Sequence, residues 1–89
     1  MFLHIGNGKS VRKKDVIGIF DLDTATITKT GKDFINKMQR EGRVEYEDDD
    51  LPRSFLLIEE NKKYKVNLSR ISSRGLAARA DESVYDKEN

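Results

Sequence analysis

"SFLLIEENKKYKVNL", residues 54–68, decides the fold, because this stretch reads as two strands joined by a tight connection. Its first arm, residues 55–58, is wholly apolar, and its second arm, residues 64–68, alternates apolar side chains with Lys65 and Asn67. Such alternation predicts a strand with one face on a core and the other in water. We therefore expect a β-hairpin that turns near residues 60–63.

Three further strands are predicted upstream of this hairpin. Residues 1–6 alternate, and Asn7-Gly8 is a dipeptide preferred in tight hairpin turns because both residues tolerate positive φ. Residues 9–13 form the return strand of that turn. The run from Val16 to Leu22 is apolar on both faces apart from Gly18 and Asp21, which predicts a central strand.

One main helix is predicted from about Gly31 to Glu41, after an Asp- and Thr-rich loop over residues 21–31. Thr30 is the expected N-cap, and Gly42 is the expected stop. Phe34, Ile35 and Met38 form a narrow apolar stripe, so this helix needs a sheet to lie on.

The remaining segments complete an α+β domain. Residues 43–47 predict a short edge strand, Ser69 caps a short final helical segment over 70–80, and the acidic tail over 81–89 is expected to be disordered. The predicted fold is a single domain over residues 1–80. It consists of a small antiparallel sheet with one main helix packed on it and a short C-terminal helical segment.

Composition excludes several classes of protein. The 89-residue chain has no cysteine and a single histidine, so disulfides are excluded and neither a zinc site nor a cofactor is expected. A domain this small often needs self-association for stability. No apolar stretch approaches the roughly 20 residues that span a bilayer, which predicts a cytoplasmic protein without a membrane partner.

Two motifs that suggest ligand chemistry are incomplete. "GNGKS", residues 6–10, lacks the first glycine of a phosphate-binding loop, where Leu3 stands, and a hairpin turn explains it better. "EYEDDD", residues 45–50, lacks the ligand spacing of a calcium loop and reads as a solvated loop. With one histidine, no catalytic set can be assembled, so neither an enzyme nor a small-molecule substrate is expected.

The net charge of +1 conceals an alternation along the chain. Residues 1–44 carry a net charge of +4, residues 45–50 carry −5, residues 51–80 carry +5, and residues 81–89 carry −3. The folded body is therefore basic, which favours a polyanionic partner, although a solvated surface of mixed charge remains the alternative. The candidate DNA-binding residues are Lys9, Arg12, Lys13, Lys14, Arg53, Arg70 and Arg74.

Most of the chain resembles the RemB family of extracellular matrix regulatory proteins. The resemblance is carried by "DVIGIFD" (15–21), "GKDFINKMQREGRV" (31–44) and "PRSFLLIEENKKYKVNLSRISSRGLAAR" (52–79). It implies an α+β domain similar to LytTR-type DNA-binding domains, and rings like those that the sister family RemA forms to wrap DNA.

The resemblance also implies particular site residues. Arg53 matches a position where RemA has a DNA-contacting arginine, and the other key arginine falls at Asp15, beside Lys13 and Lys14. The first hypothesis is a regulator of transcription that binds double-stranded DNA as a homo-oligomer. The alternative is an interaction or scaffold module whose basic face meets an acidic protein.

Overall fold

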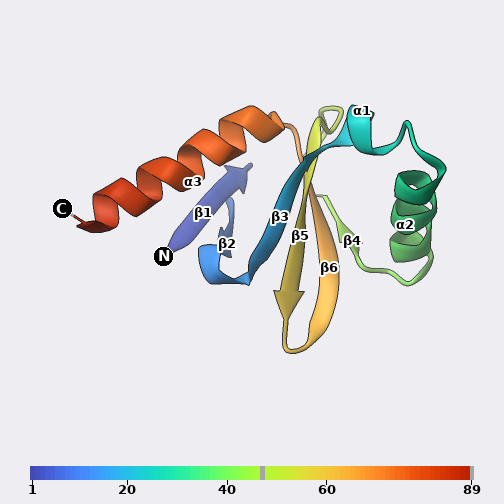
Figure 1. Ribbon diagram of the computed structural model, residues 1–89, viewed down its shortest axis with the longest axis horizontal. Helices are drawn as coiled ribbons and strands as arrows, with labels where there is room; N and C mark the ends of the chain where they lie inside the picture. Colours follow the sequence, from blue (N-terminus) through green and yellow to red (C-terminus); the bar gives the residue numbers. More distant parts are fainter. Residues whose placement is uncertain (47, 89) are drawn as a thin grey trace.

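The structure, a computed structural model, describes the backbone of residues 1–46 and 48–88 and the side chains as far as Asp81. It is an α+β fold in which a four-stranded sheet lies between two covering layers, as Figure 1 shows. One main helix covers one face, and a two-stranded hairpin together with the last helix covers the other. The elements are β1 (Phe2–Gly6), β2 (Lys9–Arg12), the 3-10 helix η1 (Lys13–Asp15), β3 (Val16–Asp21), α1 (Leu22–Ala25), α2 (Lys29–Arg40), β4 (Val44–Glu45), β5 (Ser54–Glu60), β6 (Lys63–Ser69) and α3 (Ser73–Glu88).

The predicted hairpin is confirmed as the centre of the sheet, whose strand order is β3-β5-β6-β4. β5 and β6 pair antiparallel from Ser54↔Ser69 to Glu60↔Lys63, while β4 adds parallel to β6. The prediction that Val16–Leu22 is a central strand is wrong, because β3 lies at an edge and, among the described strands, pairs with β5 alone. One apolar face of β3, with Val16 and Ile19, packs on the core beneath the β1–β2 hairpin and α3, whereas Ile17 and Phe20 remain 51% and 41% exposed.

The turn between β5 and β6 consists of two residues in the left-handed region. Asn61 has φ of 55° and Lys62 has φ of 66°, the conformation of a type I′ turn. Asparagine tolerates this region, whereas a lysine carries a Cβ penalty there that glycine lacks. The hairpin therefore holds a mildly strained residue at its tip.

We expect Lys62→Gly to raise the free energy of unfolding by about 1 kcal/mol, because glycine removes the Cβ clash of the left-handed region. Chemical denaturation measures the change as a higher midpoint. Lys63→Gly, within paired β6, is the matched control and should lower the midpoint. A midpoint that falls for Lys62→Gly would contradict the turn geometry.

Both faces of the sheet carry a core, which corrects the expectation of a wet face at Asn67 in the second arm of the hairpin. Phe55 and Val66 pack with Met38 of α2 on one side. Leu56 and Ile58 pack on the other side with the β1–β2 hairpin and with Leu76 of α3. Asn67, expected in water, is only 2% exposed because it points into this second layer.

The main helix begins two residues earlier than predicted. Thr28, not Thr30, is the N-cap of α2, and its hydroxyl accepts a hydrogen bond of 3.0 Å from the Gly31 amide. The predicted loop before it contains one turn of helix, α1, which is capped by Asp21. The apolar stripe is confirmed, with Met38 buried, and so is the stop at Gly42, whose φ is 69°.

The final helix is longer than the segment predicted over residues 70–80. α3 begins at Ser73 and continues to Glu88. Its cap is Ser72 rather than Ser69, because the Ser72 hydroxyl accepts a hydrogen bond from the Gly75 amide. The proposed boundary at residue 80 therefore falls inside a helix, and Asn89 lies outside the described residues. Leu76 anchors α3 on the sheet and is fully buried.

Candidate nucleic-acid interface

Three of the candidate arginines lie at one end of the sheet, where β5 begins and β6 ends. The Arg53 amide donates to the Ser69 carbonyl at 2.8 Å, and its own carbonyl accepts from the Leu22 amide at 3.0 Å. The backbone of Arg53 is thus fixed between β3 and β6 while its side chain is exposed. Arg70 follows β6 directly, and Arg74 stands in the first turn of α3. We call Arg53, Arg70 and Arg74 the arginine end.

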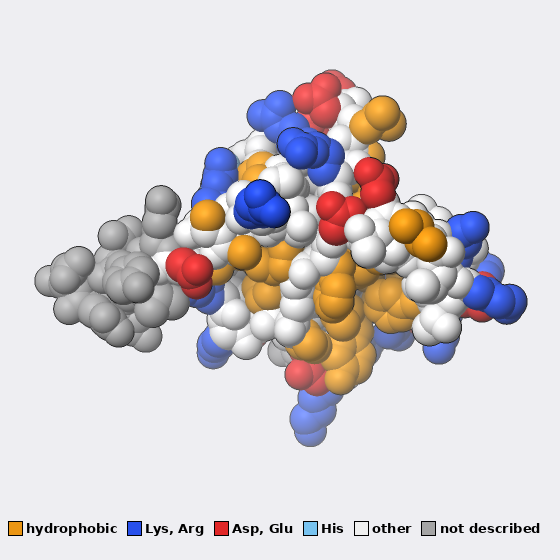
Figure 2. Space-filling view, turned by 45° about the horizontal axis from the view of Figure 1, so that its top comes forward, with side chains coloured by type: hydrophobic (Ala, Val, Ile, Leu, Met, Phe, Trp, Pro, Cys, Tyr) orange, Lys and Arg blue, Asp and Glu red, His pale blue; other side chains and the backbone are white. Residues whose placement is uncertain are grey.

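Figure 2 turns the upper end of Figure 1 towards the viewer and shows lysine and arginine side chains gathered with acidic side chains among them. Among the described residues, Arg53 and Arg74 form no ion pair, and both are exposed. Arg70 differs, because acidic side chains already occupy its guanidinium.

The acidic segment, which we define as residues 45–50 without the undescribed residue 47, folds onto the arginine end. Arg70 Nε lies 3.0 Å from an Asp48 carboxylate oxygen, and Arg70 Nη1 lies 3.1 Å from Asp50. The Tyr46 hydroxyl donates to the Asp50 carbonyl. Partial burial, followed by the charges of Asp48 and Asp50, raises the pKa of the Tyr46 phenol. The expectation of a loop that is merely solvated is therefore wrong at these contacts.

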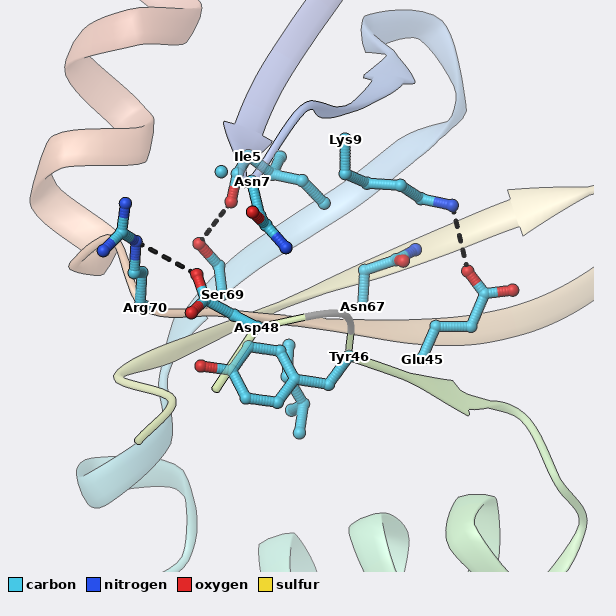
Figure 3. Close-up of a pocket in the computed structure, with 11 residues that line it drawn as sticks. Ile5, Asn7, Lys9, Glu45, Tyr46, Asp48, Asn67, Ser69 and Arg70 are labelled. Carbon is cyan, nitrogen blue, oxygen red and sulfur yellow. Dashed lines mark hydrogen bonds and ion pairs between the residues drawn. The ribbon is translucent and has the colours of Figure 1, made fainter. Parts of the chain in front are cut away.

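Lys9 is also paired with the acidic segment rather than directed to solvent. Its Nζ lies 3.3 Å from Glu45, which also lies 3.7 Å from Lys65. Figure 3 shows this ion pair on one side of a small pocket and the Arg70–Asp48 pair on another. Carboxylates of one segment thus neutralise two of the seven candidate residues.

The pocket between these ion pairs is small, at about 20 Å³. The Asn67 side chain lines it, and Asn67 Nδ2 is the buried side-chain polar atom without a partner in the described part of the chain. A volume of this size holds about one water molecule. The pocket beneath the acidic segment is therefore large enough for a water molecule on Asn67 Nδ2 and too small for a substrate.

The N-terminal basic residues do not join the arginine end. Arg12, Lys13 and Lys14 lie where β3 begins, whereas Arg53 lies where it ends, and six strand residues separate two points by roughly 20 Å. Arg12 Nε pairs with Asp15 at 2.8 Å, and Lys13 Nζ donates to the Ala80 carbonyl at 2.6 Å. Lys14 alone of the three is exposed without a partner among the described side chains.

The seven candidates therefore fall into three places: the arginine end, the start of β3 and the Lys9–Glu45 pair. The ion pairs of the acidic segment with Arg70 and Lys9 were not predicted from the sequence. The change in net charge from −5 over residues 45–50 to +5 over residues 51–80 could have indicated them, since neighbouring blocks of opposite charge can pair.

No protein-family model matches the chain, and no curated protein matches it.

Within residues 1–46 and 48–81, no three histidine, cysteine or acidic side chains are grouped to hold a metal ion. None of the helices in the described part is long and apolar enough to cross a bilayer. The fold and the basic surface thus define a small α+β domain with an arginine-rich sheet end.

Proposed function

We propose that the protein is a DNA-binding regulator of transcription that contacts duplex DNA through the arginine end. The observation that carries the proposal is the placement of Arg53, Arg70 and Arg74 at one end of a rigid sheet. Arginine presents a planar fork of donors that suits phosphate oxygens and guanine edges. Because the backbone of Arg53 is held by two hydrogen bonds, its side chain starts from a fixed position.

Self-association in the cytoplasm completes the proposal. Three arginines per chain bind weakly, but a homo-oligomer, ring-like as in RemA, the sister of the family that the sequence resembles, repeats this interaction along one duplex. Lys14 at the start of β3 adds a further exposed charge to each copy. The regulated genes that the resemblance implies, and that we include in the proposal, are those for the extracellular matrix.

Fluorescence anisotropy with a labelled duplex of mixed sequence, repeated across a salt series, tests the proposal. Each phosphate that the protein neutralises contributes roughly −0.9 to the slope of log affinity against log salt. We expect binding at low salt with a slope equivalent to several phosphates. A protein that does not bind the duplex even at low salt is not a DNA-binding regulator of this kind.

We expect the double variant Asp48→Asn, Asp50→Asn to bind duplex DNA more tightly than the unmodified protein. Both carboxylates that contact Arg70 are then neutral, so phosphate no longer competes with them. Two surface ion pairs of up to about 1 kcal/mol each correspond to a gain of up to roughly thirtyfold. The same titration measures it.

The control for this variant is Asp33→Asn, Glu41→Gln, which raises the net charge equally but lies on and just after α2. It should change affinity much less. An equal gain in both variants would mean that net charge, rather than release of Arg70, sets the affinity.

The alternative function is a module that binds an acidic protein. Arg70 and Lys9 already hold carboxylates at 3.0–3.3 Å, so this surface accommodates them. An acidic partner would compete with the acidic segment for Arg70 and Lys9, and its binding would not require DNA. Absence of duplex binding, together with tighter binding of an acidic peptide by the Asp48→Asn, Asp50→Asn variant, would favour this alternative.

A further inference from the structure

The two edges of the four-stranded sheet are protected very differently. The β4 edge is only two residues long, and its Glu45 forms ion pairs with Lys9 and Lys65. Short strands and charged side chains are the usual devices that keep sheet edges from pairing. The β3 edge is six residues long, and its sequence, "VIGIFD", contains no lysine, arginine or proline.

No strand in the described part of the chain pairs with the outer side of β3. The Leu22 amide bonds to Arg53, so the backbone at this point faces β5. Because successive residues of an antiparallel strand alternate in direction, Asp21 and Ile19 direct their N–H and C=O groups to the open side. β3 therefore offers main-chain donors and acceptors to an added strand.

The side chains along this edge are apolar and open to solvent. Ile17 is 51% exposed and Phe20 is 41% exposed, although Phe20 also stacks on Phe55 with ring centroids 5.0 Å apart. Ile17 borders a groove of about 420 Å³ between the sheet and α2, which Met38 and Leu57 also line. Ile17 thus links the edge to this groove, whose rim also carries Lys37, Glu41 and Arg43.

The charges that flank β3 identify the occupant. Lys14 precedes the strand, Asp23 follows it, and both are exposed without an ion pair among the described residues. In an antiparallel pair of identical strands, the start of one lies beside the end of the other. Lys14 then approaches the partner's Asp23, and the reverse pairing repeats across the two-fold axis.

We propose that the open edge of β3 pairs antiparallel with β3 of a second copy of this chain, joining the two sheets into one continuous sheet. This inference rests on the self-association in the proposed function and names its interface and symmetry. The two-fold interface closes on itself, so any larger ring uses this dimer as its unit and a second, different interface between dimers.

Light scattering of the full chain without DNA, across the micromolar range, tests the proposal with two lysine substitutions. In the register that brings Lys14 beside the partner's Asp23, Ile17 lies opposite the partner's Phe20, so Ile17→Lys places a charge against an apolar side chain. We expect the assembly to dissociate or to halve its mass. Ile27→Lys is the matched control, because Ile27 is 77% exposed but lies between α1 and α2. It should keep the mass of the unmodified protein.

A charge exchange tests the antiparallel arrangement separately. Lys14→Asp and Asp23→Lys should each weaken association, and the double variant should restore it because the pair re-forms with opposite sign. A monomeric unmodified protein, or an assembly whose mass Ile17→Lys leaves unchanged, would overturn the proposal.

Because the masses are measured without DNA, this test is independent of the proposed function. A dimer that fails to bind duplex contradicts the DNA-binding proposal alone. If the protein binds duplex but Ile17→Lys leaves the mass of its assembly unchanged, only the β3 interface is contradicted.

Discussion

Replacing Arg53, Arg70 and Arg74 together by glutamate is expected to weaken duplex binding by at least about a hundredfold. A hydrogen bond from a charged group contributes about 1.5–3 kcal/mol, and glutamate adds repulsion from phosphate. The salt slope should become shallower by roughly 0.9 for each phosphate that the variant no longer neutralises, which separates the removal of three arginines from a general weakening. Anisotropy titrations across salt measure both quantities.

The control replaces Lys29, Lys32 and Lys37 by glutamate, three exposed lysines of α2 that give the same change in net charge. α2 covers one face of the sheet, whereas the arginine end lies at the end of the strands. Affinity should therefore fall only modestly. Equal effects of both triple variants would show that net charge alone drives binding, and circular dichroism confirms that each variant is folded.

Gly31→Ala is expected to destabilise the protein by about 2 kcal/mol or more, although alanine is the better helix former by about 1 kcal/mol. A Cβ at Gly31 would lie 1.7 Å from the Ala25 carbonyl oxygen, a backbone atom that cannot rotate away. The end of α1 must then separate from the first turn of α2, where Thr28 caps the helix.

Thermal and chemical denaturation measure this destabilisation. Asn36→Ala, at an exposed position of the same helix, is the control and should be neutral or slightly stabilising. If Gly31→Ala were as stable as the unmodified protein, the close approach of α1 to α2 would be contradicted.

Local patterns predicted the hairpins and the main helix well, because turn chemistry and side-chain periodicity act over a few residues. Asn7-Gly8 does turn between β1 and β2, with φ of 48° and 77°. Residues 54–68 do form a hairpin, and Met38 does face the core. Each of these features depends only on neighbours in the chain.

The predictions that failed depend on what covers a strand. The apolar run of β3 suggested a central strand, but β3 lies at an edge where Ile17 and Phe20 are exposed. Asn67 looked solvent-facing because it alternates with Val66 and Leu68, yet the β1–β2 hairpin and α3 cover its side of the sheet. Periodicity shows that two faces differ, and it does not reveal a second layer.

The candidate site could be predicted residue by residue but not as a surface. Arg53 and Arg70 lie at the same end of the sheet because the register Ser54↔Ser69 brings two distant segments together. Lys13 and Lys14 are closer to the start of β3 than to either arginine, so the length of the strand separates charges that the sequence places in one basic set. The pairing of Arg70 with Asp48 also depends on this tertiary arrangement.

The central place of the β5–β6 hairpin sets the order in which the chain can fold during its synthesis. β3 and β4 leave the ribosome first, yet each pairs in the sheet only with a strand that lies after residue 53. Before that point, β1 and β2 are the strands that can pair with each other. The nascent chain therefore carries the apolar β3 unpaired until β5, residues 54–60, has been made, and a chain that stops before β5 has no sheet for it to join.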